Sequence, residues 1–71
     1  MRRDFRIFDR YTYDFIGAFN STENEAEQNA MQMMEEFNRI RKLIGFEPYT
    51  EVFVMANHYT DVDDYSFNLS V

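Results

Sequence analysis

Apolar side chains recur at helical spacing through the middle of the chain, and this feature constrains the fold more than any other. They are Ala26, Ala30, Met33, Phe37, Ile40 and Ile44. Their intervals of four, three, four, three and four residues place them along one side of a helix. Thr22 with Glu25 three residues later is typical of a helix start, and Gly45 followed by Pro48 is typical of a helix end. The sequence therefore predicts a helix over residues 22–44 with this stripe buried.

Segments of strand-like sequence flank the predicted helix on both sides. Two apolar runs within residues 5–19 are separated by a polar break at residues 9–14, which predicts a β-hairpin. Residues 49–59 are β-rich, and residues 65–71 alternate apolar with polar side chains. This order predicts an α+β fold, ββαββ, with one long helix packed on one face of an antiparallel sheet of three or four strands. Residues 1–71 are expected to form this one small domain.

The predicted hairpin has two apolar faces. If Asp9 pairs with Asp14 across the turn, Phe8 faces Phe15, because cross-strand partners share a side. One face then carries Phe5, Ile7, Ile16 and Ala18, and the other carries Arg6, Phe8, Phe15 and Phe19. One helix covers only one face of a sheet, so we expect an exposed aromatic face that binds a partner. The alternatives are a strand register that differs from this one, or a curled sheet that covers its own second face. In the turn, Tyr13 occupies a left-handed position that usually requires glycine.

Length and composition exclude several classes of protein. A chain of 71 residues buries only roughly 60% of its unfolded surface, so the core is small. There is no cysteine, which excludes disulfides and thiolate chemistry. The longest apolar run, residues 52–56, is far shorter than the ~20 residues of a membrane helix. We therefore expect a cytoplasmic protein, in the host cytoplasm if it is viral, with no membrane partner.

The charge of the chain is negative and distributed in blocks. The net charge is −6; residues 11–38 carry six acids and no base, and residues 47–71 carry five acids and no base. Nucleic acid would repel most of such a surface, so no direct contact with nucleic acid is expected. A protein with a basic surface would be attracted to it.

Three aspartates close together, Asp61, Asp63 and Asp64, suggest a metal site at first sight. A calcium loop also needs a bend glycine and a distal glutamate, and this segment has neither. We therefore predict a solvated turn, with no metal ion and no cofactor. His58 is the only histidine, and no serine or threonine stands in a recognisable catalytic context, so no enzyme activity is predicted.

These observations favour a small acidic, non-enzymatic protein-binding module. In size and charge the chain is similar to the small acidic inhibitors of phages and mobile elements, some of which imitate DNA, and this implies a partner whose basic nucleic-acid-binding surface is occluded. The predicted contacts are the carboxylates of Glu47, Glu51, Asp61, Asp63 and Asp64 and the rings of Phe8, Phe15, Phe53 and Tyr59. The alternative is a homodimeric structural or accessory module that associates through the aromatic sheet face. A small enzyme or accessory subunit is the least favoured interpretation.

Overall fold

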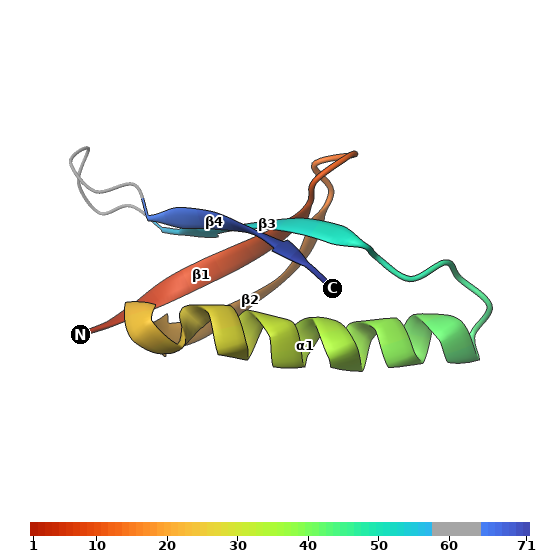
Figure 1. Cartoon of the computed structure of the whole chain (residues 1–71), viewed down its shortest axis with the longest axis horizontal. Coiled ribbons are helices and arrows are strands. Elements are labelled where there is room, and N and C mark those ends of the chain that lie inside the picture. The colour runs from red at the N-terminus through yellow and green to blue at the C-terminus, as the bar shows by residue number, and fades with distance from the viewer. Residues whose placement is uncertain (58–64) are drawn as a thin grey trace.

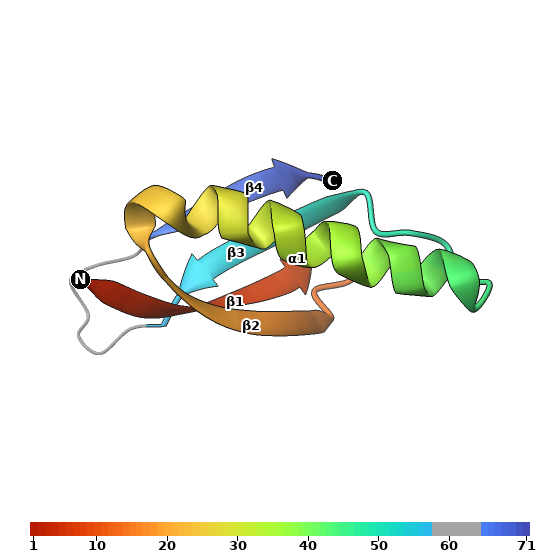
Figure 2. The same cartoon turned by 90° about the horizontal axis from the view of Figure 1, so that it is seen from below.

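A four-stranded antiparallel sheet and one long helix make up the structure, a computed structural model that describes residues 1–57 and 65–71. The elements are β1 (Arg2–Asp9), β2 (Phe15–Thr22), α1 (Glu23–Leu43), β3 (Glu51–Ala56) and β4 (Ser66–Ser70). The strands lie in the order β2-β1-β3-β4, and each neighbouring pair is antiparallel. The helix crosses one face of the sheet, and no other described element covers the opposite face (Figures 1 and 2). The predicted ββαββ fold is confirmed, with four strands.

Both ends of α1 follow from their sequence. Thr22 is the N-cap residue with an extended backbone, and its hydroxyl donates to the Glu25 carboxylate over 3.0 Å. Gly45 has a φ of +89°, the left-handed conformation that glycine adopts most readily. The N–H of Phe46 donates to the carbonyl of Arg41 over 2.8 Å, and the N–H of Gly45 donates to that of Lys42 over 3.3 Å. These two bonds form a Schellman motif, which satisfies the last carbonyls of the helix.

The core lies between the sheet and the first two thirds of the helix. Its fully buried members are Phe5 and Ile7 of β1, Val52, Val54 and Ala56 of β3, and Ala26, Ala30 and Met34 of α1, joined by Leu69 of β4. Two alanines on the helix allow it to approach the sheet closely, so the larger side chains of the strands fill the layer between them. Burying a large apolar side chain stabilises the fold by about 1.5–3 kcal/mol.

The turn between β1 and β2 is held by its own polar groups. The carboxylate of Asp9 accepts from the N–H of Tyr11 over 2.7 Å, and the Thr12 hydroxyl accepts from the N–H of Asp14 over 3.2 Å. The N–H of Asp9 donates to the carbonyl of Asp14 over 2.9 Å, as the sequence predicts for a hairpin closed by these two residues. Tyr13 has a φ of +63°, which confirms a left-handed residue without glycine at this position.

The predicted faces of β2 are partly wrong. Phe8 does pair with Phe15, but Ile7 pairs with Gly17, so Ile16 is an extra residue in a β-bulge. Beyond a bulge every side chain changes face, because strand side chains alternate with a period of two. Phe19 therefore lies on the helix side, where its ring stacks on that of Phe5 at 5.2 Å, and Ala18 lies on the opposite side with Arg6.

The predicted burial of the helical stripe holds for its first half only. Ala26 and Ala30 are fully buried, whereas Ile40 is 47% exposed and Ile44 is 63% exposed. Met34, rather than Met33, is the methionine buried at the centre of the contact. The reason is geometric: the last turns of α1 extend past the end of the sheet, as Figure 2 shows. The apolar period is present there, but no strand lies beneath it.

Candidate interaction surface

The face of the sheet opposite α1 has an apolar centre. Phe15, Phe8 and Phe53 are consecutive cross-strand partners on β2, β1 and β3, so their rings form one row across the sheet. Met55 and Ala18 flank this row on the same face. We call Phe8, Phe15 and Phe53 the aromatic row. No described element covers the row, because α1 lies on the other side of the sheet (Figure 1).

Ring contacts hold the aromatic row in a defined geometry. The rings of Phe8 and Phe15 are 5.9 Å apart at an interplanar angle of 67°, an edge-to-face contact. The guanidinium of Arg6 lies 5.9 Å from the centroid of the Phe8 ring. Phe15 remains 58% exposed, while Phe8 and Phe53 are half-buried by their neighbours. Two of the three rings thus contact each other across neighbouring strands, and the third, Phe53, pairs with Phe8 in register.

Polar groups surround the aromatic row. The hydroxyl of Ser70 donates to both carboxylate oxygens of Glu51, over 3.0 and 3.1 Å. At the other end of the face, the side-chain amide of Asn20 donates to Asp4 over 2.9 Å and accepts from Arg2 over 2.6 Å. An apolar centre with a polar rim is the usual anatomy of a protein–protein interface.

The predicted contact residues are only partly brought together. Phe8, Phe15 and Phe53 share one face, and Glu51 stands on that face two residues before Phe53. Glu47 is exposed on the segment that follows α1, away from the row. Tyr59, Asp61, Asp63 and Asp64, together with His58, lie outside the described residues.

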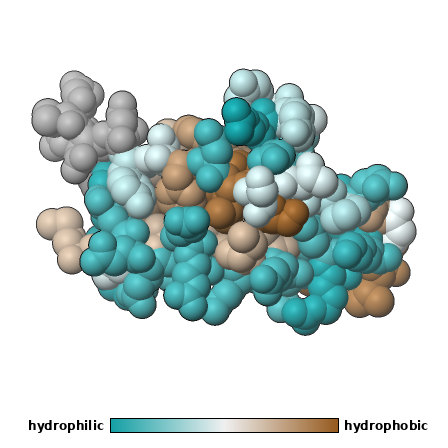
Figure 3. Space-filling view, viewed as in Figure 1, coloured by the Kyte–Doolittle hydropathy of each residue, from teal (hydrophilic) through white to brown (hydrophobic). Residues whose placement is uncertain are grey.

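A second exposed apolar surface, which was not predicted from the sequence, lies at the end of α1. Leu43 is 80% exposed, and Ile40, Ile44 and Phe46 are each about half exposed or more. Figure 3 shows brown, apolar side chains gathered at this end of the molecule. We call Ile40, Leu43 and Ile44 the helix overhang. The signal was present in the element lengths: a 21-residue helix is about 31 Å long, whereas the six residues of β3 span only about 20 Å.

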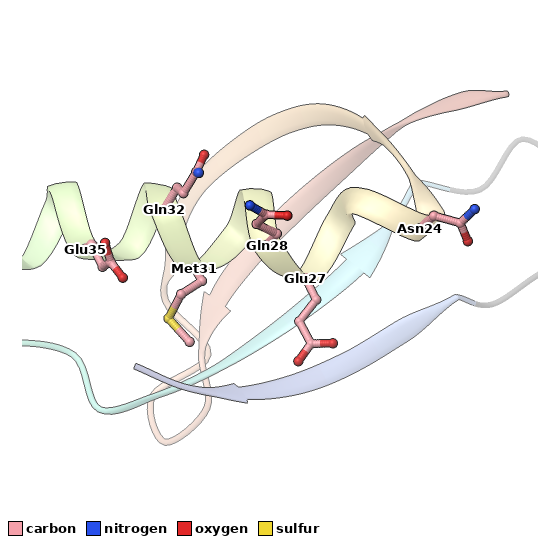
Figure 4. A pocket seen from close by; sticks show the side chains of 6 residues that line it. All are labelled: Asn24, Glu27, Gln28, Met31, Gln32 and Glu35. Carbon is pink, nitrogen blue, oxygen red and sulfur yellow. The ribbon is translucent and has the colours of Figure 1, made fainter.

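A hollow along the polar side of α1 is not a convergent site. Its lining residues are Asn24, Glu27, Gln28, Met31, Gln32 and Glu35. All six come from the helix itself, and Figure 4 shows their side chains pointing in different directions along it. Among residues 1–57 and 65–71, no group of three or more acidic or histidine side chains is placed to hold a metal ion.

Comparison with protein-family models, with curated proteins and with solved structures gave no match. Within the described part of the chain, no helix has the length and apolar character needed to cross a membrane.

Proposed function

We propose that the protein is a small non-enzymatic binding module that holds a protein partner on the uncovered face of its sheet. The observation that carries this proposal is the aromatic row, three phenylalanine rings in cross-strand register on a face that no described element covers. Exposed aromatic side chains on a rigid scaffold are typical anchors of protein interfaces, because they bury a large area while losing little conformational entropy.

The expected chemistry of the partner rests on the net charge of the chain, because the charges beside the row are mixed. Glu51 borders the row and Arg6 lies against the Phe8 ring, whereas the chain as a whole carries a charge of −6, with Glu47 exposed away from the row. The aspartates Asp61, Asp63 and Asp64 would add to this field. A partner with a basic surface, such as one that handles nucleic acid, would be steered towards the module by these carboxylates and anchored by the rings. In that role the module would occlude the basic surface of its partner.

Two phenylalanines of nearly equal exposure provide a matched test. Phe15 is 58% exposed within the row, and Phe46 is 57% exposed outside it. We expect a protein captured from the native cell by the wild-type chain to be lost with Phe15→Ser and with the Phe8→Ser/Phe15→Ser double variant. Phe46→Ser should retain the same protein. Equal loss with Phe15→Ser and Phe46→Ser would contradict a specific role for the row.

The charge contribution can be measured separately once that partner is purified. Changing Asp61, Asp63 and Asp64 to Asn should lower the association rate at low salt and leave the melting temperature unchanged. Added salt should reduce the difference between this triple variant and the wild type. An association rate that is the same for both proteins at low salt would remove Asp61, Asp63 and Asp64 from the proposal and leave the row as its main contact.

A further inference from the structure

The outer edge of β2 lacks the usual protection of an edge strand. Among the described residues, β2 pairs with β1 along one side and with no strand along the other. Its eight residues, FIGAFNST, contain no charged side chain and no proline. Natural edge strands are usually short, charged or interrupted by proline, so that their free backbone groups do not pair with another chain. The single bulge at Ile16 lies near the start of the strand and leaves the pairing from Gly17 to Thr22 regular.

An apolar flank of α1 lies directly above this edge. A Cβ atom on Gly17 of β2 would lie 2.9 Å from the Phe37 ring and 3.5 Å from the Met33 sulfur, so both side chains sit over this strand. Ile40 and Ile44 continue the same flank at helical spacing and are 47% and 63% exposed. The β2 edge is therefore bordered by a row of apolar side chains that extends into the helix overhang.

The opposite flank of the helix is already covered. The side-chain amide of Asn38 donates to the carbonyl of Tyr49 over 3.0 Å, and its oxygen accepts from the N–H of Tyr49 over 2.8 Å. The guanidinium of Arg41 lies 4.1 Å from the centroid of the Tyr49 ring and donates to the carbonyl of Glu47 over 2.7 Å. In the described part of the chain the flank on the β2 side remains bare, so the exposed Ile40 and Ile44 and the exposed strand edge belong to one continuous surface.

The other edge of the sheet is less suited to pairing. β4 is also uncharged, but it has only five residues. The helix flank on that side begins at Glu23, whose carbonyl accepts from the Tyr65 hydroxyl over 3.4 Å, and continues one turn later at Glu27. Figure 4 shows the Glu27 side chain projecting on the β4 side of the helix. Two copies that met along β4 would bring like charges together, whereas the β2 side presents Met33, Phe37 and Ile40.

We infer that β2 is a dimerisation edge, along which a second copy of this chain adds its own β2 in the antiparallel direction. Two identical strands that pair in the antiparallel direction are related by a two-fold axis, so the same residues of each copy form the contact. Each copy carries a charge of −6, and the uncharged β2 edge is where two copies approach with little repulsion. The product is a continuous sheet made of both sets of strands, with the two helices side by side on one face and both aromatic rows on the other.

We place the two-fold axis at Ala18, close to the middle of the eight residues of β2. An axis at Ala18 would pair Gly17 with the partner's Phe19, and both of these residues lie on the helix side of their sheet. Ala18 itself is exposed on the open face and would lie opposite the partner's Ala18. In this register the Met33–Phe37 flanks of the two helices meet in antiparallel orientation across the axis.

Sedimentation of two single variants distinguishes this dimer from one formed by the aromatic row. The wild type should show a concentration-dependent shift from monomer to dimer. Ile40→Glu should abolish dimerisation, because it places a charge on the apolar helix flank, whereas Phe8→Ser, on the opposite face of the sheet, should leave it unchanged. A wild type that remains monomeric at high concentration would overturn the inference. So would a dimer that is lost with Phe8→Ser and retained with Ile40→Glu.

Charge variants at the axis test the register. Ala18→Lys and Ala18→Asp should each be monomeric alone, because like charges would face each other, and an equal mixture of the two should recover the dimer. Asn68→Lys, on β4, should dimerise like the wild type. Since the chain has no cysteine, Ala18→Cys should also form an intermolecular disulfide under mild oxidation, and Asn68→Cys should not. Equal cross-linking at both positions would rule out pairing through β2, and a mixture that stays monomeric would rule out the register with its axis at Ala18.

Discussion

The two halves of α1 carry the same apolar pattern and have opposite environments. In residues 23–34 the pattern places Ala26, Ala30 and Met34 fully in the core. In residues 35–44 it places Phe37 partly over β2 and leaves Ile40 47% and Ile44 63% exposed. The difference lies beneath the helix and not within it, because the sheet ends before the helix does (Figure 2). A helical apolar stripe thus specifies which side can be buried, and the neighbouring element determines how much of that side is buried.

The overhanging half of α1 is held by local contacts instead of a core. The Schellman motif at Gly45 satisfies its last carbonyls. Asn38 forms two hydrogen bonds with Tyr49, in the segment that joins α1 to β3. Arg41 and Lys42 in its last turn also interact favourably with the helix dipole. These contacts keep the apolar side chains of the second half in a fixed array on the surface. Local capping and polar contacts can therefore hold an apolar helix end that the core does not support.

The largest expected effect comes from the buried half. Met34→Ala should lower the free energy of unfolding by about 2–5 kcal/mol, because it leaves a cavity in a fully buried position. In a domain of this size that loss is a large part of the total stability. Urea denaturation followed by circular dichroism measures it. A change below about 1 kcal/mol would show that the first half of the helix does not depend on this core.

A smaller effect is expected where the two halves meet. Gly17→Ala places a Cβ atom 2.9 Å from the Phe37 ring, closer than unstrained atoms approach. We expect a loss of about 1–3 kcal/mol from this overpacking. In a Phe37→Leu background, where the ring is absent, the same change should be considerably less harmful, and a double-mutant cycle measures that coupling. Additive effects would mean that Phe37 does not pack on Gly17.

The fold class, the element order and the helix ends could be predicted from the sequence because each depends on local chemistry. Each signal determines the structure of residues close to it in the sequence. This holds for the capping residue Thr22, for the left-handed Gly45 and for the alternation after residue 65. The Phe8–Phe15 pairing could also be predicted, because the turn at Asp9 sets the register beside it. The placement of these residues did not require knowledge of distant elements.

The predictions that were wrong concern burial and side-chain direction, which depend on how elements distant in the sequence pack together. One bulge residue, Ile16, moved Phe19 to the helix side of the sheet and Ala18 to the open face. The adjacent Gly17 was a sequence signal for it, because an isolated glycine within a strand often marks a bulge. The exposure of Ile40 and Ile44 depended on the relative lengths of helix and strands. The uncovered aromatic row could be predicted, because a sheet with two apolar faces and one helix has one face left over. The unpaired edge of β2 and the helix overhang could be identified only from the observed strand order.

Substitutions at two left-handed residues should change the free energy of unfolding in opposite directions. One residue is at the overhanging end of the helix, and the other is in the β1–β2 turn. Gly45 has a φ of +89°, and a Cβ atom added there would meet nothing within 4 Å, so Gly45→Ala should lose about 1 kcal/mol through backbone strain alone. Tyr13 has a φ of +63°, so Tyr13→Gly should gain about 0.5–1 kcal/mol by relieving that strain. Thermal melts of both variants at low protein concentration test this. The same sign for both would mean that side-chain contacts, and not the backbone, dominate at one of the sites.

The smallest expected effect comes from the overhang itself. Leu43→Gln keeps a good helix former and removes an apolar side chain that is 80% exposed. In dilute solution, where the chain is monomeric, the free energy of unfolding should change by less than about 0.5 kcal/mol. Urea denaturation under the conditions used for Met34→Ala gives the direct comparison between the two halves of α1. If Leu43→Gln instead destabilised the monomer as much as Met34→Ala, the end of the helix would have to pack against another part of the same chain. The exposed end of the helix would then be covered within the monomer, and the difference between the two halves would disappear.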